Sequence, residues 1–139
     1  MNIIDTRDLI GTRDELKEQI LDSFLDDFPH YADMTESFED IRFEEEELDS
    51  WKLDWVEDLS EITRIDELEN EIGSEFEDGV QLIEEAYFED YCADLLEDLG
   101  YISRDFPSWI EIDWGATASN IRLDYSEVEF DGITYLYRV

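Results

Sequence analysis

The chain has 139 residues, of which 42% are hydrophobic and 14% aromatic, so it has the material for a packed core and lacks the low hydrophobicity of a disordered acidic tail. Its 42 acidic residues outnumber 9 basic ones, which gives a formal net charge of −33. This charge argues against nucleic acid and anionic membranes as partners, because both bind clusters of Lys and Arg. The same charge attracts basic proteins.

The charge is unevenly distributed along the chain. Residues 31–100 contain 27 acidic and 3 basic residues, whereas the segments before and after them have net charges of only −5 and −4. We expect an acidic, mainly helical region over residues 1–75 and an α+β region over residues 76–139. One continuous domain is also compatible with this length.

The first predicted element is an amphipathic helix over residues 11–28. Its apolar side chains recur at every fourth position: Leu16, Ile20, Phe24 and Phe28. Thr12 and Glu15 have the spacing of a capping box, which predicts the start of the helix there. Pro29 predicts its end, and residues 31–43 are expected to form a loop or an irregular turn.

Residues 43–62 combine a dense run of carboxylates with two tryptophans. On a helical wheel one side contains the apolar residues Leu48, Trp51, Trp55, Val56, Leu59 and Ile62, and only Leu53 lies on the wrong side. The other side contains the acids Glu46, Glu47, Asp49, Asp54, Glu57, Asp58 and Glu61. A helix here buries its tryptophans and exposes a carboxylate roughly every 3–5 Å along its axis. The apolar pattern continues to Ile72 and stops at Gly73.

A short strand at residues 79–83 and a strong helix at residues 84–100 follow. The inner face of this helix is predicted to contain Tyr87, Phe88, Tyr91, Cys92, Leu95, Leu96 and Leu99. Its outer face is predicted to contain Glu85, Glu89, Asp90, Asp94, Glu97 and Asp98. The aromatic residues of both acidic helices, Trp51, Trp55, Tyr87, Phe88 and Tyr91, fit either a core or part of a dimer face.

The C-terminal residues predict a short helix and a hairpin. The helix covers residues 112–121, and alternating apolar residues then surround Asp131 and Gly132, a pair favoured in type I′ turns. The fold class expected from all these elements is α+β. Acidic amphipathic helices pack with a small antiparallel sheet that includes the C-terminal β-hairpin.

The residues that most often perform catalysis are scarce in this chain. Cys92 is the only cysteine and lies on the apolar side of its helix, which predicts a buried, inert thiol. His30 is the only histidine and follows a proline, so we expect a surface cap and no Ser-His-Asp triad. Asp26 and Asp27 lie near His30, yet nothing else marks a metal site. We therefore expect no enzymatic activity, no cofactor and no metal.

The sequence also bears on the location of the protein. The first twenty residues lack the charged and apolar regions of a signal peptide, and a single cysteine cannot form an internal disulfide. No apolar run approaches the ~18 residues of a membrane span. We therefore expect a cytoplasmic protein.

Three explanations of the polyanion differ in what they require. Adaptation to high salt predicts evenly spread acids and a depleted core, and a cation buffer needs no fixed geometry. Imitation of nucleic acid needs ordered acids at high density. The charge of −24 in residues 31–100 equals that of about 12 base pairs, or ~40 Å of duplex. The clustered acids and abundant aromatics favour imitation.

Three segments resemble a known family. The helix "LIEEAYFEDYCADLLEDLG", the segment "IDWGATASNIRLDY" and the hairpin "VEFDGITYLYR" occur in this order within residues 80–139. They resemble the C-terminal half of the ArdA antirestriction proteins of phages and mobile elements. The resemblance implies a non-enzymatic DNA mimic, a homodimer, that occupies the DNA-binding groove formed by the specificity and methyltransferase subunits of a host type I restriction–modification enzyme. Incoming phage or plasmid DNA is thereby protected.

The resemblance also implies which acids replace phosphates. Matched onto this chain, they are Glu84, Glu85, Glu89, Asp90, Asp94, Glu97 and Asp98. The helical wheel adds a second stripe of Glu46, Glu47, Asp54, Glu57, Asp58 and Glu61. Two alternatives stay open: a DNA mimic that inhibits another host defence, repair or nucleoid protein, and an acidic chaperone of basic proteins.

Overall fold

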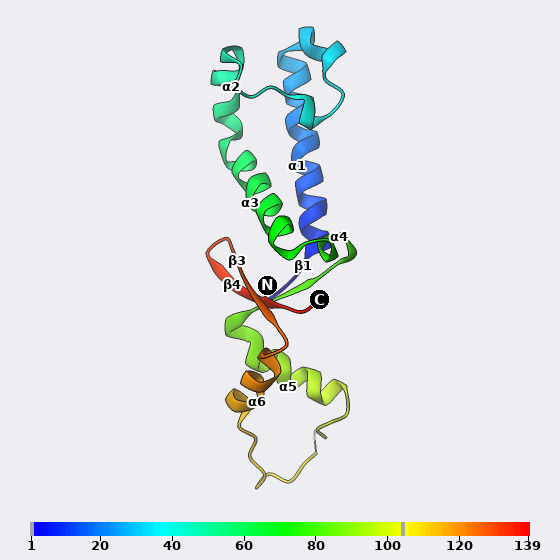
Figure 1. The fold of residues 1–139 in the computed structure, drawn as a ribbon, viewed down its shortest axis with the longest axis vertical. Coiled ribbons are helices and arrows are strands. Elements are labelled where there is room, and N and C mark those ends of the chain that lie inside the picture. Colours follow the sequence, from blue (N-terminus) through cyan, green and yellow to red (C-terminus); the bar gives the residue numbers. More distant parts are fainter. Residues whose placement is uncertain (1, 104) are drawn as a thin grey trace. The chain divides into compact units, whose positions relative to one another are not determined.

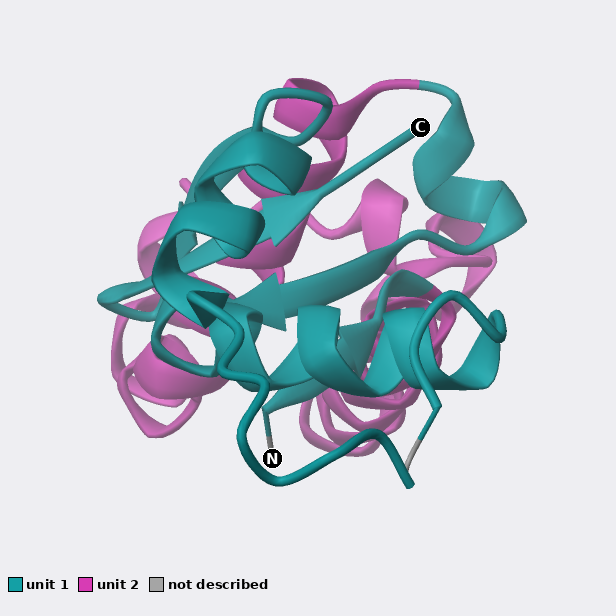
Figure 2. Cartoon of the chain, turned by 90° about the horizontal axis from the view of Figure 1, so that it is seen from below, with its two compact units in different colours: residues 1–6, 74–139 teal, residues 7–73 magenta. Residues whose placement is uncertain are grey.

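The computed structural model describes residues 2–103 and 105–139 and divides into two compact units (Figure 1 and Figure 2). Arg7–Gly73 form one unit, which we call the helical unit. Met1–Thr6 and Ser74–Val139 form the other, which we call the sheet unit. The α+β class expected from the sequence is confirmed, since helices accompany a four-stranded antiparallel sheet that includes the C-terminal hairpin.

Two long helices dominate the helical unit. They are α1 (Thr6–Asp27) and α3 (Val56–Ile72), joined by the short elements η1 (Pro29–Met34), η2 (Phe38–Asp40), η3 (Glu46–Leu48), α2 (Asp49–Lys52) and η4 (Leu53–Trp55). Arg13 near the start of α1 contacts Asp66 and Glu69 near the end of α3, at 2.7 Å each. The two helices are therefore antiparallel. The predicted end of α1 before Pro29 and the irregular turn after it are confirmed.

The predicted capping box at Thr12 and Glu15 is wrong, because α1 begins six residues earlier, at Thr6. Thr12 lies inside the helix, where its hydroxyl donates to the Asp8 carbonyl at 3.1 Å. Strand β1 (Ile3–Asp5), which the sequence analysis did not assign, leads directly into the helix. Tertiary pairing of this strand thus overrides the local capping signal.

The continuous helix expected over residues 43–62 is divided into η3, α2, η4 and the first turns of α3. Trp55 departs from helical backbone angles, with φ −113° and ψ 9°. The burial pattern follows the helical wheel for Leu48, Trp51 and Ile62, which are buried, and Leu53 is exposed as expected. Val56 contradicts the wheel, because the change of direction at Trp55 leaves it 54% exposed.

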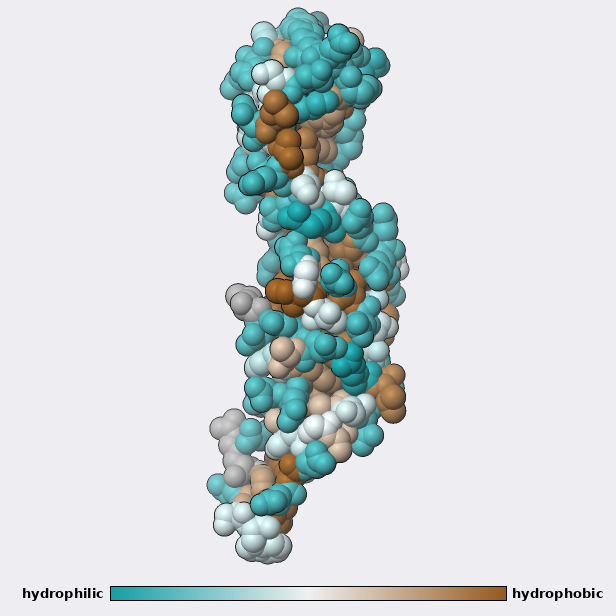
Figure 3. Space-filling model, turned by 90° about the vertical axis from the view of Figure 1, so that its left-hand side faces the viewer, coloured by the Kyte–Doolittle hydropathy of each residue, from teal (hydrophilic) through white to brown (hydrophobic). Residues whose placement is uncertain are grey.

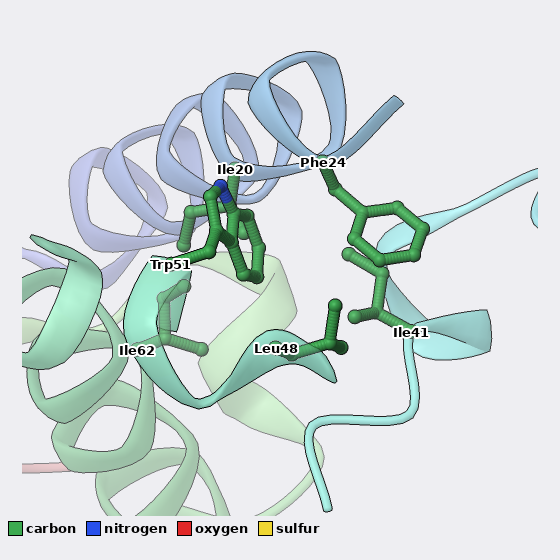
Figure 4. Packing of buried hydrophobic residues seen from close by; sticks show 6 residues of the cluster. All are labelled: Ile20, Phe24, Ile41, Leu48, Trp51 and Ile62. Carbon is green, nitrogen blue, oxygen red and sulfur yellow. The ribbon is translucent and has the colours of Figure 1, made fainter. Parts of the chain in front are cut away.

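The core of the helical unit is an aromatic cluster around Trp51. Its ring centroid lies 5.6 Å from that of Phe24 and 6.0 Å from that of Phe28, both on α1. The indole Nε1 donates to the Ser23 hydroxyl at 3.0 Å, which satisfies the one polar atom of the ring. Figure 4 shows the buried members of the cluster: Ile20, Phe24, Ile41, Leu48, Trp51 and Ile62.

The sheet unit has the strand order β1-β2-β4-β3, all antiparallel. Its further elements are α4 (Glu75–Asp78), β2 (Gln81–Glu84), η5 (Glu85–Tyr87), α5 (Phe88–Asp98), α6 (Trp114–Arg122), β3 (Ser126–Phe130) and β4 (Ile133–Tyr137). The hairpin between β3 and β4 turns at Asp131 and Gly132, whose φ values of 52° and 78° fit the expected type I′ turn.

Helices α5 and α6 pack against each other and against one face of this sheet. Phe88 and Cys92 of α5 and Ala118 of α6 form a buried cluster with Ile83 of β2 and Leu136 of β4. Sequence reasoning placed Phe88 and Cys92 inward correctly, whereas Leu99, expected inward, is 60% exposed because α5 ends at Asp98. The carboxylate of Asp113 caps α6 by accepting from the Ala116 N–H at 3.0 Å.

A fully buried hydroxyl joins segments of the sheet unit that are far apart in sequence. Thr6 accepts a hydrogen bond from the Val80 N–H and donates one to the Phe76 carbonyl, both at 2.8 Å. Thr6→Val keeps the shape of the side chain but leaves the Val80 N–H without this acceptor. We expect a loss of about 1–3 kcal/mol in the free energy of unfolding, measured by urea denaturation. Thr12→Val, at an exposed position, is the control, and equal losses in the two variants would contradict the assignment.

Tyr125 provides a pH test of the same unit. Burial raises its pKa to about 12, and its ring packs on Phe88 with 5.0 Å between centroids. The unfolded chain ionises this tyrosine near its ordinary pKa of 10, so its contribution to stability is complete below pH 10 and decreases as the pH rises from 10 towards 12. Ultraviolet titration is expected to show a phenol that ionises near pH 12, and Tyr125→Phe is expected to remove this latest phase.

Candidate acidic binding faces

The thirteen acids predicted to replace phosphates all lie outside the buried cores. In the helical unit, Glu46 and Glu47 lie on η3, Asp54 on η4, and Glu57, Asp58 and Glu61 on the first turns of α3. In the sheet unit, Glu84 ends β2, Glu85 lies on η5, and Glu89, Asp90, Asp94, Glu97 and Asp98 lie on α5. The structure therefore gathers them into two sets, one in each unit.

Both units are strongly acidic. The helical unit contains 24 acidic and 6 basic residues, and the sheet unit contains 18 acidic and 3 basic ones. Figure 3 shows one face of the molecule, on which hydrophilic side chains cover most of the surface and apolar side chains form small patches. The excess of acid is therefore a property of each unit separately.

Helix α5 holds its acids in a fixed arrangement. Phe88 and Cys92 bury one side of the helix, while Asp90, Asp94 and Asp98 follow one another at every fourth position on an exposed side. Residues four positions apart are ~6 Å apart along the helix axis, and each is rotated by about 40° around the axis from the one before. Because the inner side is anchored in the cluster with Ile83 and Leu136, the orientation of the acidic side is set by the core.

Contacts with neighbouring side chains fix some of these acids individually. Arg122 of α6 donates to Glu85 at 2.6 Å and to Glu127 at 3.0 Å. In the helical unit, Glu47 accepts from the Tyr31 hydroxyl and from His30 Nε2, each at 2.9 Å. The hydrogen bond to Glu47 raises the pKa of the Tyr31 phenol. His30 therefore lies at the surface, as the sequence predicted, and its side chain contacts Glu47.

Helix α1 contains an acidic stripe that the sequence analysis did not select. Asp14, Glu18, Asp22 and Asp26 recur at every fourth position and are all exposed. The signal was available, because the same periodicity identified the apolar side of this helix. The sequence analysis selected residues 43–62, where the acids are densest, and passed over the more regular stripe on α1.

The aromatic residues of the two acidic helices do not form one stripe. Trp51 and Trp55 belong to the cluster of the helical unit, with 6.4 Å between their centroids. Tyr87, Phe88 and Tyr91 belong to the cluster of the sheet unit. Each group of aromatic residues therefore packs in the core beneath the acidic helices of its own unit.

Two features of the described residues bear on reactive chemistry, and a third bears on membrane insertion. Cys92 is fully buried, and burial raises the pKa of its thiol, which disfavours the nucleophilic thiolate. Within the described residues, no group of three or more His, Cys, Asp and Glu side chains has the arrangement of a metal site. No helix among the described residues is both long enough and apolar enough to span a membrane.

Comparison with protein-family models, curated proteins and solved structures finds no match to this chain.

Self-repulsion among the acids gives a direct physical test. Raising the NaCl concentration from 0.01 M to 0.15 M shortens the Debye length from ~30 Å to ~8 Å and weakens the repulsion between exposed carboxylates. We expect stabilisation of about 1 kcal/mol, seen as a rise of ~3–6 °C in the melting temperature by circular dichroism. An uncharged osmolyte at equal osmolality is the control. A melting temperature that falls with salt would show that attractive ion pairs outweigh the repulsion.

Proposed function

We propose that this protein is a DNA mimic that occupies the DNA-binding groove of a host type I restriction–modification enzyme and so protects incoming phage or plasmid DNA. The observation that carries the proposal is the density of exposed carboxylates on anchored helices. The 11 residues of α5 include five acids, or one acid per ~3 Å of helix axis. One strand of duplex DNA has a phosphate every 3.4 Å of axis.

The long helices of the other unit support the same comparison. The 17 residues of α3 include seven acids, or one per ~4 Å of axis. Two of them, Asp66 and Glu69, pair with Arg13, and the exposed stripe of α1 adds further acids. Burial lowers the pKa of Arg13, but the hydrogen bonds that its guanidinium donates to Glu69 and Asp66 outweigh burial and raise the pKa, so the cation stays charged.

Order distinguishes this surface from an ordinary polyanion. A disordered acidic chain loses conformational entropy when it binds, which reduces its affinity. Here the clusters around Trp51 and Phe88 hold the helices before any partner arrives. Pre-organised charges also guide the encounter with a positively charged groove, and salt weakens that attraction.

The choice of a type I enzyme rests on the resemblance of residues 80–139 to the ArdA family. The same resemblance supports a homodimer without enzymatic activity that acts in the host cytoplasm. The proposal is tested by adding the purified protein to a type I enzyme and measuring cleavage of unmodified DNA that contains its recognition site. We expect the protein to inhibit cleavage even when excess poly-glutamate is present as a nonspecific polyanion. If poly-glutamate alone inhibited cleavage equally well, negative charge would explain the inhibition and the mimicry of DNA would be contradicted.

Other targets are separate outcomes of this test. If the type I enzyme is unaffected, pull-down from host lysate followed by competition with duplex DNA identifies a different DNA-binding target. A protein that binds many basic partners without displacing DNA is a chaperone, which would overturn the mimic proposal.

Neutralisation of acids tests how binding is distributed. Exposed charges contribute little individually, so Glu57→Gln alone is expected to weaken inhibition by no more than ~3-fold. Changing all five acids of α5, Glu89, Asp90, Asp94, Glu97 and Asp98, to amides is expected to weaken it by more than ~30-fold, because several such contributions add.

A matched control removes the same charge elsewhere in the sheet unit. It changes acids outside α5 to amides: Asp105, Glu111, Asp124, Glu129 and Asp131. We expect this variant to inhibit within a few-fold of the parent protein. Complete loss from one substitution, or equal losses in the two multiple variants, would contradict a phosphate-like face on α5.

A further inference from the structure

The helical unit contains a pocket that the acidic faces do not explain. Its volume is about 460 Å³, which is within the range of about 300–1,000 Å³ typical of ligand sites. Phe24, Ile41 and Leu48 of the aromatic cluster line it. Figure 4 shows Phe24 and Ile41 on the side of the cluster away from Ile62. Met34, which is 66% exposed, supplies a further apolar wall.

The other residues that line the pocket are mainly acidic. They include four acidic residues and one cation, Arg42. The acidic residues are Glu39, Asp40, Glu44 and Glu45. Lys17 pairs with Glu39 at 2.8 Å, and the pocket still has more acids than bases around it. The pocket lining therefore combines apolar side chains with an excess of acidic ones, which we call the acidic rim.

The acidic rim is partly pre-organised. The Asp40 carboxylate accepts hydrogen bonds from the Glu36 N–H at 2.9 Å and the Ser37 N–H at 3.1 Å. These backbone donors lower the pKa of Asp40, so this carboxylate remains charged at neutral pH. Tyr31 also lines the pocket and is tied to Glu47 by its hydroxyl.

We propose that this pocket receives a Lys or Arg side chain of the target protein together with the apolar side chain beside it. Charge complementarity selects the occupant, since the rim attracts a cation and repels an anion. The apolar lining residues, of which Met34 is exposed, suit the hydrocarbon stem of Lys or Arg and an adjacent Leu or Phe. DNA phosphates make no such apolar contact, so the pocket gives the protein a means of recognition that DNA lacks. This inference rests on the proposed function, because the occupant belongs to the DNA-binding protein.

The test uses the full chain with labelled methyl groups on Met and Ile and two blocked peptides as probes. One peptide is Gly-Ser-Leu-Arg-Phe-Ser-Gly, and the other is Gly-Ser-Gly-Arg-Gly-Ser-Gly. We expect the first to shift the nuclear magnetic resonance signals of the Met34 and Ile41 methyls in a saturable way. It is expected to bind at least ~10-fold tighter than the second, because burying one apolar side chain contributes about 1.5–3 kcal/mol.

Variants at exposed positions localise the effect. Met34→Ser is expected to weaken binding of the Leu-Arg-Phe peptide by ~5–10-fold, and the double variant Glu44→Gln/Glu45→Gln by ~3-fold or more. Leu53→Ser and Glu75→Gln/Glu77→Gln make the same chemical changes outside the pocket and are expected to have no comparable effect. Equal affinity for the two peptides, unshifted Met34 and Ile41 methyls, or equal effects of the control variants would overturn the inference.

The result is separable from that of the proposed function. If the peptides do not bind the pocket while the protein inhibits the type I enzyme, only the pocket assignment fails. If the Leu-Arg-Phe peptide binds as expected while restriction is unaffected, the choice of target fails and the pocket remains.

Discussion

Burial of aromatic and aliphatic side chains must offset the repulsion between carboxylates in every part of this protein. A fully buried Leu, Ile or Phe side chain contributes about 1.5–3 kcal/mol, whereas an exposed pair of charges contributes at most ~1 kcal/mol. The cluster around Trp51 and the cluster around Phe88 therefore determine whether the acidic helices are ordered.

Two arginines lie where acids from different segments approach each other. Arg13, whose side chain is only 11% exposed, connects α1 to Asp66 and Glu69 of α3. Arg122 connects α6 to Glu85 and Glu127, which come from η5 and β3. Each arginine thus relieves a local concentration of charge within one unit and leaves the outward sides of α1, α3 and α5 negative.

Local patterns were sufficient to predict most elements of the fold. Period-four burial identified α1, α3 and α5, and Asp131-Gly132 identified the hairpin, because these signals lie within single segments. Strand β1 escaped prediction because Ile3 and Ile4 are too few to show a period, and only pairing with β2 defines them. The same pairing of β1 with β2 precedes α1 directly, so the helix begins at Thr6 and not at the capping signal around Thr12. The bend at Trp55, which exposes Val56, was not predicted either, because the apolar pattern of residues 43–62 continues through it.

The candidate site divides in the same way. The outward side of the acids on α3 and α5 follows from sequence periodicity, since apolar residues specify the inner side, whereas Glu84 ends strand β2 and was assigned from the family resemblance. The sequence analysis placed the thirteen acids in an acidic region of residues 1–75 and an α+β region of residues 76–139, and in the structure the two sets lie in the helical unit and the sheet unit. The pocket beside Ile41 was beyond sequence reasoning, since it is built from α1, η1, η2 and η3 together.

The claim that ordered carboxylates replace phosphates is tested most directly by displacing a short labelled duplex from a type I restriction enzyme at several salt concentrations. The account predicts competitive displacement, with an affinity that falls linearly on a logarithmic salt scale with a slope close to that of the duplex itself. Failure to displace the duplex at any salt concentration would contradict it. An affinity independent of salt would do so as well.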